Sequence, residues 1–186
     1  MEFVAGQSYL LQADSGKGKS SLFAYIYGYR DDFEGEILFD GRRTPLVGSP
    51  EWDTIRQCRI GILFQDLKIF PELTALENIE LKNRLQAYKS EAEIDDMLRR
   101  LEILDKSHQP CGKLSWGQQQ RVAIIRALCQ PFDFLLLDEP ISHIDDRMAR
   151  IVAELIAEEV ASRQAAVVVS SIGKELPITY DNILNL

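Results

Sequence analysis

Short apolar runs alternate along the chain with segments in which apolar residues recur at helical spacing. The apolar runs have the composition of buried strands, and they lie at residues 8–12, 59–64, 132–137, 165–169 and 182–186. Helices are predicted between them, at residues 22–27, 114–128 and 145–163. Strands that alternate with helices in this way predict an α/β fold with a mostly parallel core sheet.

Residues 28–52 follow a different pattern. Glu36–Gly41 has the composition of a short strand and ends in an Asp-Gly pair, which is typical of a tight turn between antiparallel strands. Residues 44–52 contain Pro45 and Gly48 among other turn-forming residues, and we expect a loop there. This part of the chain is therefore predicted to add an antiparallel β segment to the parallel sheet.

Residues 73–104 are rich in charge and have only helical periodicity. Thr74 precedes Glu77, and Ser90 precedes Glu93, at the spacing of a capping box, in which two side chains satisfy the free amides of a helix N-terminus. We therefore predict a helical subdomain at about residues 67–114. It would be inserted between two parts of one core, residues 1–66 and 115–186.

A stretch rich in glycine, serine and lysine joins the first predicted strand to the first predicted helix. It reads Ala13-Asp14-Ser15-Gly16-Lys17-Gly18-Lys19-Ser20-Ser21 and follows the pattern of a phosphate-binding P-loop, with alanine in place of the first glycine. Glycines let backbone amides wrap around phosphates, and the helix N-terminus adds partial positive charge. We expect Lys19 to reach the β- and γ-phosphates of ATP, and the Ser20 hydroxyl to bind Mg²⁺.

Charge, cysteine content and hydropathy exclude several classes of protein. The net charge of −8 on 186 residues argues against a general nucleic-acid surface, although a local phosphate site is compatible with it. Cys58, Cys111 and Cys129 fit neither a zinc pattern nor a disulfide framework. No apolar run reaches the roughly 18 residues of a membrane span, and residues 1–6 lack the features of a signal peptide. We expect a cytoplasmic protein that reaches a membrane only through a partner.

Five motifs, taken in chain order, resemble those of the ATP-binding cassette (ABC) ATPases. After the P-loop come a Q-loop glutamine, a signature sequence similar to L-S-G-G-Q, a Walker B strand and a D-loop: Gln65, Leu114-Ser115-Trp116-Gly117-Gln118, Leu135–Pro140 and Ser142–Asp145. The resemblance extends over nearly the whole chain. Residues 64–79 are most similar to bacterial transporter ATPases of the lipoprotein-release, macrolide-export and cell-division type.

The resemblance implies roles around ATP for the residues that match the motifs. Asp138 would hold Mg²⁺ together with Ser20, and Gln65 would approach both Mg²⁺ and the attacking water. Glu139, the residue after Asp138, would act as the general base. The alternatives are a solvated strand end for Asp138 and Glu139, and a loop glutamine in solvent for Gln65.

In the ABC family the signature sequence binds the γ-phosphate of ATP held by a second, facing subunit. The resemblance therefore implies that Ser115, Gly117 and Gln118 contact the nucleotide of a homodimer or of a paired nucleotide-binding subunit. Asp145 would lie at the same interface. A serine hydroxyl at a helix N-terminus suits an anion, but Ser115 and Asp145 are also ordinary capping residues, and the two roles are compatible.

Three features depart from the family pattern. Trp116 replaces a signature glycine, where its ring would either crowd the facing nucleotide or stack at the interface. Ser171 is the residue aligned nearest to the position where the family has its switch histidine. His108 lies before the signature and His143 lies in the D-loop, and we expect both to be ordinary surface histidines. The aromatic residue that stacks on adenine in the family has no clear counterpart, since Phe3 lies very near the P-loop. We therefore expect ATP to be held mainly through its phosphates.

The resemblance implies an ATP-binding and ATP-hydrolysing subunit of an ABC transporter. It would dimerise around two nucleotides and couple this cycle to a separate transmembrane permease at the inner face of the membrane, docking through the Q-loop and the helical insertion. The alternative is a regulatory or structural ABC module that binds ATP with little hydrolysis; Trp116 and Ser171 favour it, and Glu139 argues against it. A soluble ABC protein of repair or translation is less well supported, because such proteins usually carry paired cassettes or long coiled arms. We expect slow hydrolysis by the isolated chain.

Overall fold

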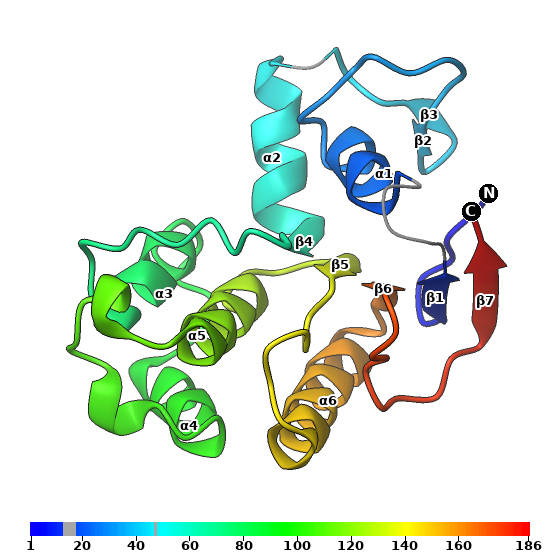
Figure 1. Ribbon diagram of the computed structural model, residues 1–186. Helices are drawn as coiled ribbons and strands as arrows, with labels where there is room; N and C mark the ends of the chain where they lie inside the picture. The colour runs from blue at the N-terminus through cyan, green and yellow to red at the C-terminus, as the bar shows by residue number, and fades with distance from the viewer. Residues whose placement is uncertain (13–17, 47) are drawn as a thin grey trace.

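Across residues 1–12, 18–46 and 48–186, which the computed structural model describes, five parallel strands form the central sheet (Figure 1). They are β1 (Ser8–Gln12), β4 (Ile60–Leu63), β5 (Phe134–Asp138), β6 (Ala166–Ser171) and β7 (Asn182–Asn185). Their order is β4-β5-β6-β1-β7. The predicted α/β fold with a mostly parallel core sheet is confirmed.

The parallel register brings the C-terminal ends of the strands to one edge of the sheet. Gln12 at the end of β1 pairs with Ser171 at the end of β6, and Asp138 at the end of β5 pairs with Ser170. Side chains that follow different strands in the sequence therefore lie near one another along this edge.

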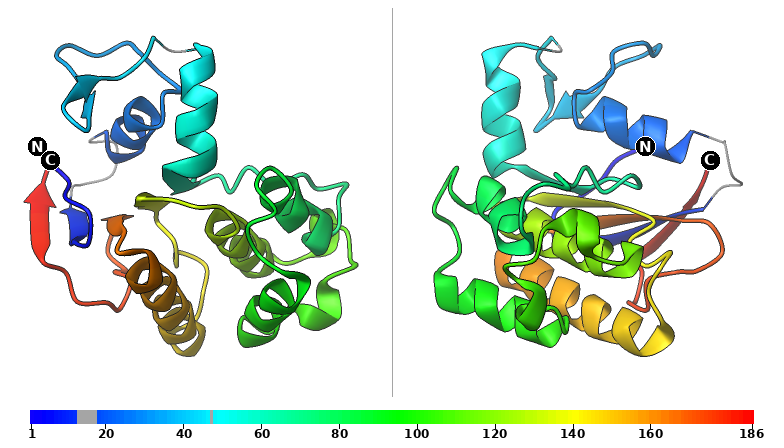
Figure 2. Two further views of the ribbon diagram at one scale, coloured as in Figure 1. Left: turned by 180° about the vertical axis from the view of Figure 1, so that it is seen from behind. Right: turned by 60° about the vertical axis from the view of Figure 1, so that its left-hand side comes forward.

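Helices cover both faces of the sheet (Figure 2). The helices on one face are α1 (Lys19–Ile26) and α2 (Pro50–Cys58), and those on the other are α5 (Trp116–Leu128) and α6 (Asp146–Arg163). Alternate residues of each strand belong to different hydrophobic clusters, since successive side chains of a strand point to opposite faces. In β1, Leu11 packs in the cluster that contains Phe23 of α1, whereas Leu10 belongs to the cluster of α5 and α6.

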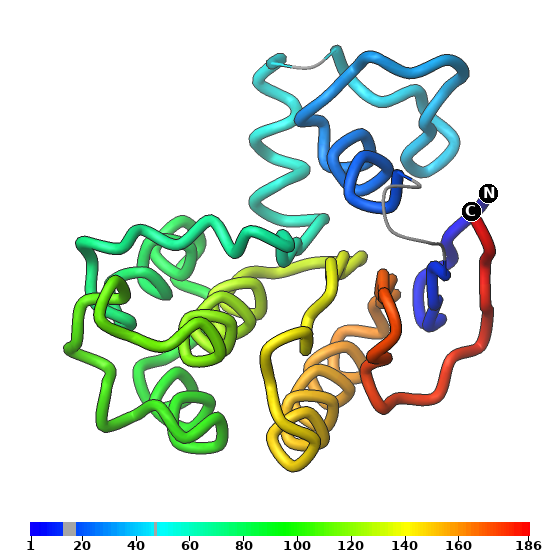
Figure 3. Tube along the Cα trace, viewed as in Figure 1, coloured from blue at the N-terminus to red at the C-terminus, as the bar shows by residue number. Residues whose placement is uncertain are grey.

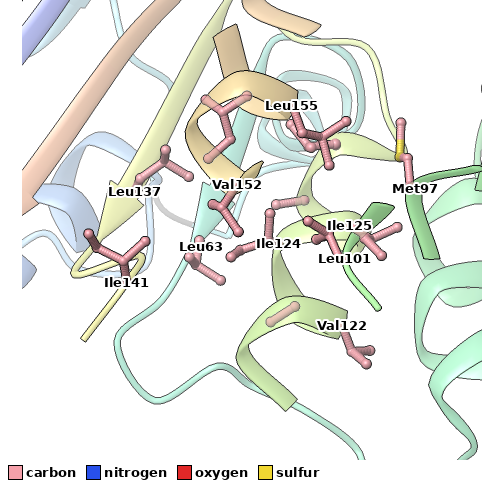
Figure 4. Packing of buried hydrophobic residues seen from close by; sticks show 14 of the residues in the cluster. Leu63, Met97, Leu101, Val122, Ile124, Ile125, Leu137, Ile141, Val152 and Leu155 are labelled. Carbon is pink, nitrogen blue, oxygen red and sulfur yellow. The ribbon is translucent and has the colours of Figure 1, made fainter. Parts of the chain in front are cut away.

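The larger cluster joins the sheet to α5 and α6. Leu63 and Leu137 from the strands pack there with Ile124 of α5 and with Val152 and Leu155 of α6 (Figure 4). The helical segment between β4 and α5 continues this cluster outward. The sheet and the helical segment are therefore held by one continuous hydrophobic core.

The segment between β4 and α5 is helical, as its periodicity predicts (Figure 3). It contains α3 (Ala75–Asn83), α4 (Glu91–Arg100) and the 3₁₀ turns η1 (Leu104–Lys106) and η2 (Cys111–Lys113). Both predicted capping boxes are present, with Thr74 and Glu77 at the start of α3 and Ser90 and Glu93 at the start of α4. No helix of the described residues combines the length and the apolar character needed to cross a bilayer.

The antiparallel segment is also present, but the loop predicted after it is wrong in its last part. Strands β2 (Leu38–Phe39) and β3 (Arg42–Arg43) form a hairpin, and Asp40 and Gly41 between them both have positive φ, as a type I′ turn requires. Helix α2 begins at Pro50, inside the predicted loop of residues 44–52. Proline suits the first position of a helix, because it lacks only an amide that would have no helical partner.

Three cations from three helices meet where the helical segment joins the core, and we call Arg56, Lys82 and Arg126 the cationic junction. Lys82 donates to the carbonyl of Arg56 at 3.3 Å, and Arg126 donates to the carbonyls of Leu67 and Lys68. Burial, followed by the positive charges of Arg126 and Arg56, lowers the pKa of Lys82 from 10.5 to about 8. The folded chain therefore holds the charge of Lys82 at a cost in stability.

We predict that Lys82→Met stabilises the protein in a pH-dependent manner. Below about pH 8 Lys82 is charged in both the folded and the unfolded chain, so the full cost of burying the charge applies. Between about pH 8 and 10.5 the folded chain loses this proton first, and the free energy of unfolding rises with pH. At pH 7 we expect Lys82→Met to raise the free energy of unfolding by on the order of 2–3 kcal/mol. The variant should also lack the increase in the free energy of unfolding between about pH 8 and 10.5 that the parent shows.

Urea unfolding between neutral and alkaline pH measures this effect. The matched control is Lys113→Met, which removes an exposed lysine from η2 and should leave both the stability and its pH dependence nearly unchanged. A Lys82→Met variant that keeps the parent's rise in stability above pH 8 would contradict the prediction.

Candidate functional site

Of the predicted phosphate-binding stretch, the described residues Gly18 to Ser21 lie at the C-terminal edge of the sheet. Helix α1 follows β1, and its first residue, Lys19, is only 5% exposed. Gly18 caps this helix with φ of 94°, a conformation that favours glycine. Ser21, in the first turn, accepts a hydrogen bond from Arg30 at 3.3 Å. Asp14, Ser15, Gly16 and Lys17 lie outside the described residues, as does Ala13.

A short chain of hydrogen bonds joins three of the predicted site residues. The Ser20 hydroxyl donates to Oε1 of Gln65 at 3.5 Å, and Nε2 of Gln65 donates to Oε1 of Glu139 at 3.2 Å. These residues come from the start of α1, the loop after β4 and the end of β5. The structure thus brings together segments that are far apart in the sequence, as the motif order predicts.

Asp138 is buried at the end of β5, where it is 4% exposed. Its carboxylate accepts a hydrogen bond from the hydroxyl of Ser170 on the neighbouring strand. A buried carboxylate is costly without such a partner, so Ser170 stabilises Asp138 in its position. Ser170 is not among the predicted site residues. The polar pair Ser170-Ser171 at the end of an apolar strand is the signal that could have found it.

Glu139 turns away from the line of the strand. Its φ of 50° is uncommon for a residue other than glycine, and its amide donates to the carbonyl of Ser170 at 3.1 Å. Burial, followed by the nearby charge of Asp138, raises the pKa of Glu139, while Lys19 and His143 act in the opposite direction. A carboxylate with a raised pKa at the rim of a polar site is suited to accept a proton.

The oxygen atoms at this edge fit a magnesium ion. Mg²⁺ prefers hydroxyl, amide and carboxylate oxygens, and it usually keeps several waters while it binds protein through one or two carboxylates and a substrate phosphate. The Ser20 hydroxyl and Gln65 Oε1 lie 3.5 Å apart, and Gln65 in turn reaches the residue that follows Asp138. The donor set therefore suits a hard divalent cation.

The predicted signature residues cap the start of α5. The amide of Gln118 donates to the Ser115 hydroxyl at 3.3 Å, and the amide of Ser115 donates to Oε1 of Gln118 at 2.9 Å. Asp145 caps α6 and accepts from the amide of Met148 at 3.0 Å, which lowers the pKa of the Asp145 carboxyl. Both capping roles are confirmed. Within the described ranges no hydrogen bond joins these residues to Ser20, Gln65 or Glu139.

Gln120, which is not among the predicted site residues, connects the end of β5 to the D-loop. Its buried side chain donates to the carbonyl of Glu139 at 3.0 Å and to the hydroxyl of Ser142 at 3.3 Å, and it accepts from the amide of His143 at 3.1 Å. A polar residue on the apolar face of a helix was the available signal, because Gln120 shares that face with Ala123 and Ile124. The base candidate and the D-loop are therefore held by one side chain.

The start of α5 and the D-loop touch each other closely. A Cβ atom at Gly117 would lie 2.6 Å from the carbonyl oxygen of His143, so this position has room only for glycine. The ring of Trp116, which is 46% exposed, meets the ring of His143 edge to face at 5.7 Å between centroids. Trp116, which differs from the family pattern, thus contacts the D-loop of this chain.

Ser171, the predicted replacement for the switch histidine, lies at the end of β6. Its hydroxyl donates to the carbonyl of Lys174 at 2.7 Å, and the ammonium of Lys174 pairs with Asp146 at 2.9 Å. The hydroxyl is therefore engaged within its own loop. Its contribution to hydrolysis stays a prediction.

A parallel sheet with a lysine at the first helix and two carboxylates at the end of a central strand defines a P-loop nucleotide-hydrolysing protein. The family model described as "ABC transporter" matches residues 1–142, which is most of the chain. The chain therefore belongs to the ABC transporter family, and it is an ATP-binding cassette of an ABC transporter with ATPase activity.

Similar proteins agree with this assignment. The lipoprotein-releasing system ATP-binding protein LolD 2 of Rhodopseudomonas palustris is 34% identical over 98% of this chain and 80% of its own length. The ABC transporter ATP-binding protein YtrE of Bacillus subtilis is 32% identical over 85% of this chain and 70% of its own. A dimeric structure of the ATP-binding cassette MJ0796 in a post-hydrolysis state, bound to ADP and Pi, has a TM-score of 0.82 and 30% identity over 92% of this chain and 77% of that chain.

We predict that Gly117→Ala destabilises the protein, although alanine usually stabilises a helix relative to glycine by roughly 1 kcal/mol. The added Cβ would push the His143 carbonyl away from the start of α5. We expect a net loss of about 1–3 kcal/mol in the free energy of unfolding, and slower ATP turnover because the D-loop shifts. Urea unfolding and steady-state hydrolysis measure the two effects. An increase in stability would contradict the close contact.

Proposed function

We propose that this chain binds Mg·ATP, pairs with a second cassette around two nucleotides, and drives a separate membrane permease. The hydrogen-bonded chain from Ser20 through Gln65 to Glu139 is the observation that carries the proposal. In this chain of contacts we assign the Ser20 hydroxyl to the P-loop, the Gln65 amide to the γ-phosphate, and the Glu139 carboxylate to the role of base. These are the parts that phosphoryl transfer to water requires.

The proposed chemistry follows from these side chains. Lys19 would neutralise the β- and γ-phosphates, and Ser20, Gln65 and Asp138 would hold Mg²⁺, which when bound balances negative charge on the phosphate oxygens. Glu139 would take the proton of a water that attacks the γ-phosphorus, while the bond to the ADP oxygen breaks. The raised pKa of Glu139 brings this carboxylate closer to the working pH, where a general base is most effective.

A second copy would complete the site. Ser115, Gly117 and Gln118 lie at the exposed start of α5, whose N-terminus offers amides and partial positive charge to an anion. Asp145 lies at the start of the neighbouring α6. We assign these residues to the γ-phosphate held by the partner subunit. The dimeric state in which the MJ0796 cassette was solved with ADP and Pi supports this arrangement.

The permease would dock on the loop after β4 and on the helical segment that follows. Phe70 in this loop and Leu81 and Leu85 near the end of α3 are large apolar side chains exposed to solvent. Apolar exposure of this kind is typical of a surface that a partner covers. The chain would then work at the inner face of a membrane without crossing it. The relatives named for lipoprotein release are the reason to consider such a partner.

A regulatory cassette with little hydrolysis is the second candidate. Trp116 adds an exposed ring at the signature, and the hydroxyl of Ser171 is engaged with its own loop. Both features would weaken catalysis without removing nucleotide binding. Turnover measurements separate the two candidates.

We predict that Glu139→Gln produces a stable dimer in Mg·ATP. The glutamine keeps the shape of the side chain but cannot accept the proton of the attacking water, so ATP stays intact at the interface. Size-exclusion chromatography with light scattering, with and without Mg·ATP, measures the assembly. The matched control, Glu91→Gln, changes an exposed acid of α4 and should remain like the parent.

A Glu139→Gln variant that stays monomeric at saturating Mg·ATP would contradict the facing-dimer proposal. Lys19→Ala in the same background provides the second control, because it removes the cation that faces the phosphates. We expect this double variant to bind no measurable ATP and to stay monomeric.

We predict that Ser171→His accelerates hydrolysis. An imidazole at the end of β6 could contact the γ-phosphate, and one preorganised transition-state contact is typically worth roughly 10²–10³ in turnover. ATP affinity should change little, because the gain appears in the transition state. Single-turnover hydrolysis at saturating ATP measures this, with Ser171→Ala as the matched control that should stay near the parent rate. An unchanged rate in Ser171→His would show that Ser171 does not limit hydrolysis.

A further inference from the structure

The cationic junction of Arg56, Lys82 and Arg126 is unusual in a chain whose net charge is −8. Among the described residues no aspartate or glutamate pairs with any of the three. Several cations elsewhere on the helical segment are paired, such as Arg84 with Glu80 at 3.0 Å and Lys89 with Glu159 at 3.0 Å. Nearby cations therefore have acidic partners, whereas the three cations of the junction have none among the described residues.

The contacts that the junction makes do not balance its charge. Lys82 and Arg126 donate to backbone carbonyls, and Arg56 lies over the rings of Tyr27, Tyr29 and Trp52 at 5.6–5.8 Å. The Nε atom of Arg56 is buried without a hydrogen-bond partner. Burial and the two neighbouring cations also lower the pKa of Lys82 to about 8. An uncompensated group of this kind is costly to the free chain.

Exposed apolar side chains lie beside the junction. Leu81 precedes Lys82 on α3, and Leu85 follows the end of this helix. Tyr29, which is 51% exposed, lies under the guanidinium of Arg56 at 5.6 Å. Phe70 is 52% exposed, and its amide is bonded to the side chain of Asn78 on α3 at 2.9 Å. The surface therefore offers half-buried positive charge next to exposed apolar groups, and it suits a ligand that carries the opposite charge on an apolar body.

We propose that the cationic junction receives an aspartate or glutamate side chain from an apolar helix or loop of the permease, which Leu81, Leu85 and Phe70 contact. This inference rests on the proposed function, because it names the chemistry of the permease segment that docks there. The carboxylate supplies the missing negative charge, so the charge of Lys82 becomes compensated only in the complex. A buried charge pair fixes the register of an interface and discriminates against partners that lack the charge.

Two capped model peptides test the proposal. Both are short fluorescent alanine-leucine helices; one has a single central glutamate, and its twin has glutamine there. We expect the full chain to bind the glutamate peptide about tenfold more tightly than its twin at low salt, as measured by fluorescence anisotropy. Lys82→Met and Arg56→Met should abolish this difference. Lys82→Arg and the matched control Lys113→Met should retain it.

Nuclear magnetic resonance of the Lys82 side chain provides a readout that does not require tight binding. The pKa of Lys82 should rise from about 8 with the glutamate peptide in excess, and not with the glutamine twin. Equal affinities for the two peptides, or a Lys82 pKa that responds to neither, would overturn the proposal. Lys82-dependent binding to vesicles of anionic lipid, without preference for the glutamate peptide, would overturn it in favour of a lipid surface.

The test is separate from that of the proposed function. A chain that forms the ATP-dependent Glu139→Gln dimer but does not discriminate between the peptides loses only the acidic docking site. A chain that discriminates between the peptides but never dimerises retains the docking site and loses the proposed nucleotide cycle.

Discussion

The hydrogen bond from Ser170 to Asp138 is the contact on which the rest of the site depends. It joins the ends of two central strands that are buried on both faces, so Asp138 is restrained in its position by this hydrogen bond and by the surrounding packing. Glu139 then leaves the strand in a left-handed conformation, and the hydrogen bond that its amide donates to the Ser170 carbonyl holds it there. Such a conformation costs free energy and persists where surrounding structure fixes it. The base candidate therefore takes its direction from the sheet and not from its own loop.

The same strand end also controls the D-loop and the start of α5, through Gln120. This buried amide uses its donor and acceptor atoms on the Glu139 carbonyl, the Ser142 hydroxyl and the His143 amide. A buried network of this kind has few alternative arrangements, because each unsatisfied member would cost free energy. A shift of Glu139 would therefore displace the D-loop, which lies at the surface proposed to meet a second cassette. This provides a physical route from the chemistry to assembly.

The sequence predicts the fold well, because its signals are local or periodic. Buried runs identify the strands, and the capping boxes at Thr74 and Ser90 identify two helix starts. The start of α2 at Pro50 was missed, because proline and glycine nearby suggested a loop. At the site, motif order places Ser20, Gln65 and Glu139 together, whereas Ser170 and Gln120 depend on strand register and helix packing. A local pattern can mark each of these polar residues in a buried element, but their contacts join residues distant in sequence, so it does not identify their partners.

Stabilising contacts and costly features lie in different parts of this chain. The cluster around Ile124 and Val152 is closely packed, and several cations of the helical segment, such as Arg84 and Arg100, are paired with acids. The costly features are concentrated at two places, the left-handed Glu139 and the unpaired charges of the cationic junction.

Natural chains keep such features where a ligand or a partner relieves them. One lies at the edge proposed to bind the nucleotide, and the other lies where the helical segment meets the core. A partner that compensated the second would act on the loop after β4, since Arg126 holds that loop through the carbonyls of Leu67 and Lys68, and Gln65 begins it. The two costs are therefore mechanically linked through a single loop.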